Sequence, residues 1–257
     1  MLNKYIFAIT ILYSVASFSI LADNNTTNLE NWSKELSQNG PEFINGVKIY
    51  RPTMNDGQLS VSDFFETQEK NDETVLTKSL LFCINNLDRT NEYIETIEPD
   101  KKRFLIDRYI TDGDGKNEMK FSYKIAFQVT DGIISFVASN ITAEFKEKGF
   151  LPRKVKIEKL KPTEKEDHKK IIENFTYQNS LFLQNLSEFV NKQNVQNVSH
   201  WQEIANGDVV EGMNETEVMI AAGRPISVRE QSAKTLWMYS NDFVVVFTDK
   251  IVSSVVR

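Results

Sequence analysis

The feature that most constrains the fold is a strict alternation of apolar and polar side chains near the middle of the chain. Between residues 121 and 129, every second position is apolar: Phe121, Tyr123, Ile125, Phe127 and Val129. The positions between them hold Ser, Lys, Ala and Gln. A period of two is the period of a β-strand, so we expect one buried face and one largely solvated face. This pattern is typical of an antiparallel sheet that helices cover on one side.

This strand is the middle one of three predicted β-runs, at 103–111, 118–129 and 132–145. The sequence Thr130-Asp131-Gly132 predicts a tight hairpin between the second and third runs. In the third run the pattern is less regular. We expect one face to carry Ile134, Phe136, Ala138 and Asn140.

Two amphipathic helices are predicted around these strands, because apolar residues recur there at helical spacing. The first covers about 72–87 and places Cys83 on its apolar face, as a small buried side chain rather than a catalytic thiol. The second covers about 164–191, and only Gln178 and Asn179 interrupt its apolar stripe. The basic stretch 149–163 between strands and helix is predicted to be a solvated loop. A contact with anionic headgroups or with a partner is the alternative for this stretch.

The last quarter of the chain predicts a separate small unit of two helices followed by three strands. Asn214 and Glu217 form a capping-box pattern before a short helix at 215–222, which Gly223 ends. An earlier helix is expected at 198–205. The strands are expected at 235–239, 243–247 and 251–256, and the continuously apolar middle one is predicted to be buried.

These elements predict an α+β protein of two small domains, each an antiparallel sheet with helices packed on one face. The expected boundaries are a signal peptide at 1–22, a first domain at 23–195 and a second at 196–257. The polar, Asn-rich stretch 191–197 is the expected linker between the two domains.

The first domain resembles the TBP-like-fold DUF4468 family of exported Bacteroidota proteins. The resemblance lies in the helix DETVLTKSLLFCINN and in the paired strands FSYKIAFQVTDGIISFVASNI, which keep the Asp-Gly turn of that family. It implies the fold of that family and brings no catalytic residues, because none is assigned there.

The second domain resembles the small outer-membrane assembly lipoproteins of the BamE/SmpA/OmlA type, which have the order ααβββ. The matching residues are Ile204, Gly207, Val210, Gly212, Met213, Glu217, Val218, Gly223, Pro225, Trp237, Tyr239, Val245 and Phe247. The lipid-bearing N-terminal Cys of that family has no counterpart in this sequence. The resemblance therefore implies a fold and a setting in the cell envelope.

The first 22 residues have the pattern of a secretory signal, with Lys4 ahead of an uncharged apolar run and Ala22 at the cleavage position. A retained N-terminal anchor is the alternative. We therefore expect an exported protein, in the periplasm or at the periplasmic face of the outer membrane, without a lipidation cysteine. The net charge of −6 argues against a nucleic-acid partner, which requires a basic surface.

A scan for reaction chemistry predicts no enzyme, no cofactor site and no metal site. The sequence Asp112-Gly113-Asp114-Gly115-Lys116-Asn117 lacks the ligand and the Gly that a calcium loop needs at its fifth and sixth positions, so a hairpin turn is expected. Neither His168 nor His200 has a second ligand at i+4, and no nucleotide-binding or nucleophile motif occurs. A hydrolase with dispersed residues is the remaining enzymatic alternative.

The leading hypothesis is a non-enzymatic binding or scaffold module of the envelope, in outer-membrane assembly or maintenance. The expected partner is an envelope protein, with an outer-membrane protein as the first candidate. Docking is expected on the exposed sheet face or on the last strand edge of the second domain. Its candidate partner-binding residues are Met213, Arg224, Trp237 and Tyr239. Core packing is the alternative role for the two aromatic residues.

The second hypothesis is a periplasmic carrier of a lipid or small molecule, with a pocket between the long helix and the central strands. Its lining would be Phe175, Phe182 and Phe189 facing Phe121, Tyr123 and Phe127. A filled aromatic core is the alternative for the same six residues.

Overall fold

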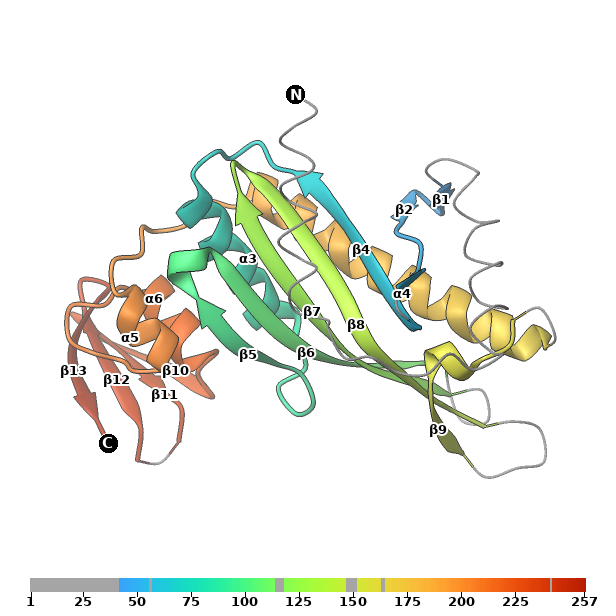
Figure 1. The fold of residues 1–257 in the computed structure, drawn as a ribbon. Coiled ribbons are helices and arrows are strands. Elements are labelled where there is room, and N and C mark those ends of the chain that lie inside the picture. Colours follow the sequence, from blue (N-terminus) through green and yellow to red (C-terminus); the bar gives the residue numbers. More distant parts are fainter. Residues whose placement is uncertain (1–41, 56, 114–117, 147–151, 163–164, 241) are drawn as a thin grey trace. The chain divides into compact units, whose positions relative to one another are not determined.

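The computed structural model describes residues 42–55, 57–113, 118–146, 152–162, 165–240 and 242–257. The described part is an α+β structure of antiparallel sheets and helices, as expected (Figure 1). Its contacts group into two units. The first comprises the described residues up to Phe65, Asp107–Phe127 and Ile134–Asn185; the second comprises Glu66–Ile106, Gln128–Ile133 and Leu186–Arg257. The expected division near residue 195 stays a prediction.

The largest sheet has the strand order β3-β4-β8-β7-β6-β5, and β9 pairs with β8 outside this path. Its strands are β3 (Thr53–Asn55), β4 (Gln58–Glu66), β5 (Tyr93–Glu98), β6 (Arg103–Asp112), β7 (Met119–Thr130), β8 (Ile133–Phe145) and β9 (Arg153–Lys156). The three long strands β6 to β8 therefore lie where the sequence predicts them. The short strand β5 was not predicted, because its sequence does not alternate between apolar and polar residues.

The predicted alternation of β7 is confirmed. Phe121, Tyr123, Ile125, Phe127 and Val129 are all at most 2% exposed, whereas the residues between them are half-buried. Because these five side chains face the core, β7 provides the central row of the apolar interior.

Strand β8 does not keep one alternation over its length. Ile134, Phe136 and Ala138 are buried, but Asn140 is exposed and has a positive φ of 56°. Beyond it, the buried positions become odd-numbered and begin at Ile141. The predicted shared face of Ile134 to Asn140 is therefore wrong at Asn140. A left-handed residue within a strand acts as a bulge, which shifts the side-chain alternation by one.

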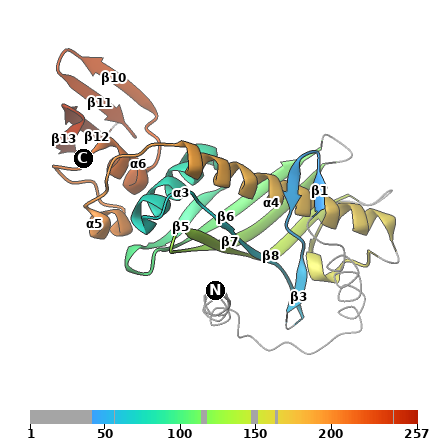
Figure 2. The same cartoon turned by 90° about the horizontal axis from the view of Figure 1, so that it is seen from above.

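The helix α4 (Glu166–Lys192) runs along one face of the sheet (Figures 1 and 2). Its Phe175 is fully buried and packs against two residues of β7. The ring centroids of Phe175 and Tyr123 lie 5.0 Å apart at 87°, and those of Phe175 and Phe121 lie 5.7 Å apart. Edge-to-face contacts of this kind stabilise an aromatic core beyond the effect of burial alone.

The short hairpin of β1 (Glu42–Ile44) and β2 (Val47–Ile49) is attached to the same helix. The backbone N–H of Tyr50, which follows β2, donates to the Ser180 hydroxyl at 2.9 Å. The N–H of Lys48 donates to the side-chain oxygen of Gln184 at 3.3 Å. These two polar residues of α4 therefore bind the backbone of an extended segment instead of facing solvent.

The helix α3 (Asp72–Asn86) begins where the sequence predicts it. Asn71 is its N-cap, and the Asn71 side chain accepts from the N–H of Thr74 at 2.9 Å. Cys83 is fully buried, as predicted. Phe82 lies 5.6 Å from Phe189, ring to ring, which packs α3 against the C-terminal part of α4.

The β7–β8 turn is the predicted tight hairpin, with positive φ at both Asp131 (55°) and Gly132 (72°). The Asp72 carboxylate, at the start of α3, accepts from the N–H of Asp131 at 3.1 Å and from that of Gly132 at 2.9 Å. The carbonyl of Gly132 accepts from the N–H of Thr67 at 2.8 Å. The turn is therefore hydrogen-bonded to Thr67, before the N-cap residue of α3, and to Asp72, after it.

The stretch 149–163 is not wholly a solvated loop. Residues Arg153–Lys156 form β9, and Ile157–Lys159 form a 3-10 turn, η4, that buries Ile157. Leu160 is buried as well. Isolated apolar residues in a basic stretch have no recognisable period, so the strand was missed.

Two predictions fall on residues outside the described ranges. The expected signal peptide at 1–22 lies wholly outside them, as do residues 114–117 of the predicted hairpin turn after β6. Among the residues that are described, no helix has the length and apolar character needed to cross a membrane.

Asn179 of α4 is fully buried, and neither its side-chain oxygen nor its nitrogen has a hydrogen-bond partner in the described structure. A buried amide without partners opposes folding, because it gives up its hydrogen bonds to water and receives none in return. In Asn174, by contrast, only the side-chain oxygen lacks a partner, because the side-chain nitrogen donates to the Asp112 carboxylate at 2.5 Å.

We predict that Asn179→Leu raises the free energy of unfolding by about 1 kcal/mol, because Leu has the same branched shape and needs no hydrogen bond. Asn174→Leu, the matched control, should lower it by about 1 kcal/mol because Asp112 loses a donor. Urea unfolding of both variants is the measurement. A destabilised Asn179→Leu would show that the amide is satisfied in solution.

We predict that Gly132→Ala lowers the free energy of unfolding by about 3 kcal/mol. A Cβ there would lie 2.6 Å from the carbonyl oxygen of Glu69, in a backbone conformation that already disfavours side chains. Gly46→Ala is the control. Gly46 also has a positive φ, of 80°, but a Cβ there meets nothing within 4 Å, so we expect a loss of about 1 kcal/mol. Equal losses in the two variants would contradict the steric argument.

Candidate functional site

The C-terminal sheet is the candidate docking site. Its strands run antiparallel in chain order: β10 (Ser227–Gln231), β11 (Lys234–Met238), β12 (Val244–Thr248) and β13 (Ile251–Val256). The helices α5 (Trp201–Asn206) and α6 (Glu215–Ala222) precede it in the chain. The order is therefore ααββββ, with one strand more than the predicted ααβββ.

The extra strand, β10, was missed because its sequence carries no strand signal. Ser-Val-Arg-Glu-Gln holds a single apolar residue, and within the described part of the chain the strand pairs with β11 alone. A strand of this kind is held by its neighbour's backbone rather than by a buried face of its own. A polar stretch that follows a proline predicts a loop, because it has neither apolar alternation nor a buried face.

One face of the sheet is packed. Trp237, Val245, Phe247 and Val252 are at most 7% exposed, and the rings of Trp237 and Phe247 lie 4.8 Å apart. Strand β12 alternates between buried and half-buried residues, so the prediction that its whole apolar run is buried holds for one face only.

The opposite face carries apolar side chains that are partly exposed. Cross-strand pairing places Leu236 beside Val246 and Met238 beside Val244. These four side chains are half-buried. Val256, on the other side of Val244, is 54% exposed. This is the exposed sheet face that the sequence predicts.

The two edges of the sheet differ. At the start of β13, the Val252 carbonyl accepts from the N–H of Gly212 at 3.0 Å, and the Val252 N–H donates to the Met213 carbonyl at 2.8 Å. The last strand therefore has part of its outer edge occupied by its own chain. On β10, in contrast, Val228 to Gln231 are all exposed. Ile226, just before the strand, is 72% exposed, and Val228 is 50% exposed.

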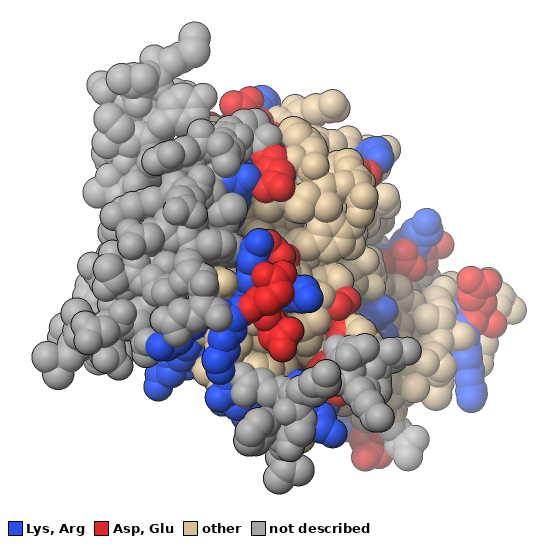
Figure 3. All heavy atoms as spheres, turned by 90° about the vertical axis from the view of Figure 1, so that its right-hand side faces the viewer, with Lys and Arg blue, Asp and Glu red and all other residues tan. Residues whose placement is uncertain are grey.

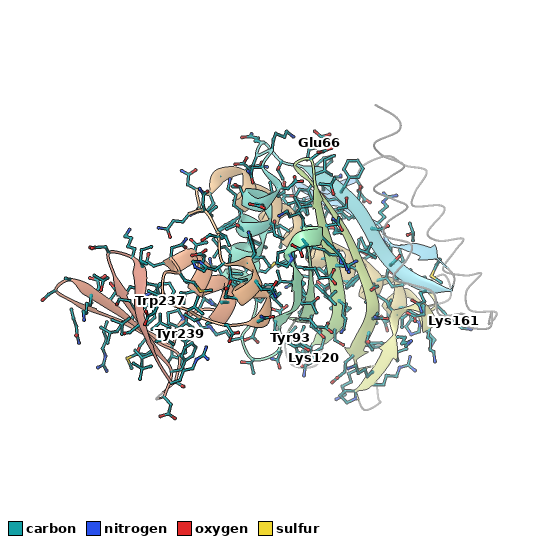
Figure 4. All side chains as sticks on the ribbon, turned by 60° about the vertical axis from the view of Figure 1, so that its left-hand side comes forward. Glu66, Tyr93, Lys120, Lys161, Trp237 and Tyr239 are labelled. Carbon is teal, nitrogen blue, oxygen red and sulfur yellow. The ribbon has the colours of Figure 1, made fainter. Side chains whose placement is uncertain are left out.

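Two of the four predicted partner-binding residues belong to the packed interior. Met213 is fully buried, and Trp237 lies against Phe247 in the covered face. Figure 4 shows Trp237 on the C-terminal sheet. A packing role accounts for both residues, as the alternative for Trp237 anticipated.

Arg224 contacts the chain's own helix α3. Its guanidinium donates to the carbonyls of Asn85 and Leu87, at 3.3 Å and 3.1 Å. These carbonyls lie at the C-terminal end of α3, where helical carbonyls lack partners within the helix. In return, Arg89 donates to the Pro225 carbonyl at 3.4 Å. The predicted binding residue therefore has an internal partner.

Tyr239 is also engaged within the unit. Its hydroxyl donates to the Gly223 carbonyl at 3.0 Å, and its ring stacks on Phe243 at 5.0 Å. Burial raises the pKa of this phenol well above its ordinary value. The four predicted residues are thus not assembled into one exposed patch, and the exposed apolar residues at the β10 edge were not among them.

The carboxylate of Glu217 organises the start of this unit. It accepts from the N–H of Asn214 at 2.7 Å, of Ser199 at 2.6 Å and of His200 at 3.0 Å, and Glu217 is 1% exposed. The Asn214 side chain accepts from the N–H of Glu217 at 3.1 Å, which completes the predicted capping box. The hydrogen bonds from Ser199 and His200 to the Glu217 carboxylate were not predicted, because no sequence spacing indicates them.

The same carboxylate orients the His200 ring, whose Nδ1 lies 3.0 Å from a Glu217 oxygen. Ser199 also approaches Nδ1, at 3.2 Å, and its hydroxyl donates to Glu217 at 3.0 Å. A serine nucleophile must instead lie at the other ring nitrogen, away from the orienting carboxylate. The Ser–His–Glu group therefore has the geometry of a structural node.

The described residues offer no candidate metal site. Within the described ranges, no three side chains among His, Cys, Asp and Glu come together as a metal site would require. The absence of an enzymatic activity stays a prediction.

We predict that Glu217→Gln lowers the free energy of unfolding by about 2 kcal/mol at pH 7. Burial alone would raise the pKa of the Glu217 carboxyl. Hydrogen bonds from the N–H groups of Ser199 and Asn214, and from His200, outweigh burial and lower the pKa below its ordinary value. A lowered folded pKa stabilises the fold above the unfolded pKa of about 4.3, and this stabilisation is lost as the pH falls through the folded value.

The difference between wild type and Glu217→Gln should therefore shrink below about pH 4 in urea unfolding at a series of pH values. Glu215→Gln removes the neighbouring charge from the same first helical turn and is the control, with an expected change below about 0.5 kcal/mol. A difference that is constant with pH would contradict the assigned role of the carboxylate.

Comparison with known proteins gives structural neighbours only. No family model matches the chain, and no curated protein matches it significantly. A TBP-like protein from Parabacteroides distasonis is 11% identical, with a TM-score of 0.49, over 55% of this chain and 97% of that structure. A DUF4468 family protein from Bacteroides ovatus is 12% identical, with a TM-score of 0.43, over 56% of this chain and 94% of that structure.

These two descriptions name the same groups as the resemblance drawn from the first domain's sequence. At such low identity, and with both TM-scores below 0.5, neither likeness carries a function over to this chain. The resemblance of the C-terminal unit to the BamE type stays a prediction.

Proposed function

We propose that this chain is a non-enzymatic binding module, and that the β10 edge accepts an extended segment of a partner protein. The observation that carries the proposal is the exposure of this edge. Among the described strands β10 pairs with β11 alone, and its residues from Val228 to Gln231 are all exposed.

An edge strand presents a row of backbone N–H and C=O groups that match another strand. Soluble proteins protect such edges with prolines, bulges and charged side chains, lysine above all. β10 has no proline, no lysine and no register shift in its pairing with β11, and its two charged residues, Arg229 and Glu230, have opposite signs. Two exposed apolar side chains, Ile226 and Val228, accompany it. An added strand would gain backbone hydrogen bonds and would cover these side chains.

The partner that we propose is another protein of the cell envelope, with an outer-membrane protein as the first candidate. The export signal expected at 1–22 and the BamE-type pattern of the C-terminal unit support this setting. A role in outer-membrane assembly or maintenance is the finer form of the proposal. The fourth strand, absent from the expected ααβββ order, would adapt such a unit for strand addition.

The carrier alternative has less support. Four of the six rings proposed to line a pocket, those of Phe121, Tyr123, Phe127 and Phe175, are at most 2% exposed. Phe175 contacts both Phe121 and Tyr123 directly. Rings that pack on one another in this way fill the space that a ligand would need.

We predict that Val228→Lys lowers the yield of the in-cell crosslinked complex at least about tenfold, because a lysine on an edge strand opposes strand addition. The measurement is crosslinking in cells, gentle purification and mass spectrometry of the intact complex. Amide hydrogen exchange of the purified complex should also show protection along β10.

Ile251→Lys is the matched control, because Ile251 is a similarly exposed apolar residue, at 42%, on the opposite edge strand. It should leave the yield unchanged. Equal losses in both variants, or a complex without protection of β10, would rule out strand addition at this edge.

A further inference from the structure

The two charged residues of the β10 edge lie on opposite faces of the C-terminal sheet. Arg229 is paired across the ladder with Leu236, and Glu230 is paired with Thr235. Thr235 is itself paired with Phe247, which is buried in the covered face, whereas Leu236 belongs to the partly exposed face. Because cross-strand partners share a face, a strand laid along β10 meets a negative charge on the covered side and a positive charge on the other.

Neither of these charges is neutralised within the described structure. Arg229 and Glu230 are both exposed, and among the described residues neither forms an ion pair or a side-chain hydrogen bond. Elsewhere in the chain, opposite charges often lie together. Lys102, for example, lies 2.8 Å from the Glu73 carboxylate, and Figure 3 shows basic and acidic side chains next to one another on the face that it presents. The two β10 charges are therefore available to a partner.

Val228 adds an apolar position beside the two charges. It is paired with Trp237 of the covered face and is 50% exposed. Three successive residues of β10 thus present an apolar side chain, a positive charge and a negative charge, in that order. In strand addition, backbone hydrogen bonds supply affinity, and the side chains that come to lie opposite one another supply specificity.

We propose that the segment accepted by β10 carries a basic, an acidic and an apolar residue in succession. This inference rests on the strand addition proposed above and specifies its partner. Every pairing within this sheet is antiparallel, and an added antiparallel strand continues the same pattern of hydrogen bonds. In that direction the basic residue faces Glu230, the acidic residue faces Arg229 and the apolar residue faces Val228.

A second copy of this chain fits the edge less well. A two-fold axis that pairs two β10 strands antiparallel keeps each side chain on its own face of the sheet. Arg229 of one copy therefore never faces Glu230 of the other, and a pair centred on either residue opposes like charges. A uniformly acidic or uniformly basic segment also fits less well, because it matches one of the two charges and opposes the other.

The test is a titration of the full-length protein into two fluorescently labelled, capped peptides, followed by fluorescence anisotropy. The peptide Thr-Thr-Lys-Glu-Val-Thr-Thr has the proposed order, and Thr-Thr-Glu-Lys-Val-Thr-Thr exchanges the two charges at constant composition. The first should bind wild type at least about tenfold more tightly, because two opposite-charge pairs replace two like-charge pairs. This preference should weaken as the salt concentration is raised.

The double variant Arg229→Glu, Glu230→Arg should reverse the preference, to at least about tenfold in favour of the exchanged peptide. Glu188→Lys, Lys192→Glu is the matched control, because it exchanges an exposed pair of opposite charges in α4. It should keep the wild-type preference. Far-UV circular dichroism and urea unfolding establish that both variants are folded.

Equal affinities of wild type for the two peptides, binding of neither peptide, or no reversal in the double variant would overturn the proposed order. Tighter binding of the exchanged peptide to wild type would overturn it as well, because a parallel strand would then meet both charges.

Amide hydrogen exchange distinguishes these outcomes from a failure of strand addition itself. If both peptides protect β10 equally, strand addition stands and the charge order is wrong. If a bound peptide leaves β10 unprotected, strand addition at this edge is wrong too. If neither peptide binds, the charge order is wrong, and the crosslinked complex from cells still decides whether β10 accepts a strand.

Discussion

The pairing of the Asp72 carboxylate with the β7–β8 turn is the interaction on which much of the fold depends. Two backbone N–H groups in the β7–β8 turn donate to the first residue of α3, while the N–H of Thr67, just after β4, donates to the carbonyl of the same turn. Strand, turn and helix start are therefore fixed by one another. Because Gly132 sits against the Glu69 carbonyl, no other residue type fits this junction without strain.

Elements with a strong period or a local cap could be predicted from the sequence. Strand β7 follows from five apolar residues at a spacing of two, and α6 follows from a capping box at Asn214 and a terminal Gly at position 223. These signals are local, because the residues that produce them lie within one element. The α+β class and the three central strands could be derived from them.

The remaining elements depend on partners that are distant in the chain. Among the described strands, β9 and β10 pair with one neighbour each and bury little, so their sequences have no alternation. The same reason explains the candidate site. The sequence predicts a binding role for Trp237 and Tyr239, but both side chains pack against other residues of the same unit. Ile226 and Val228 become candidates only when the structure shows that β10 is an edge strand. Whether a surface is free is a property of the assembled sheet.

The left-handed conformation of Asn140 determines more than the shape of β8. Without the one-residue shift there, the positions of Thr142 and Glu144 would turn toward the interior, and their cross-strand partners Lys156 and Lys154 would turn with them. Two ammonium groups would then have to be desolvated within an apolar layer. A single backbone angle in one strand thus decides whether the lysines of the next strand are buried cations or a surface that meets solvent, ions and anionic groups.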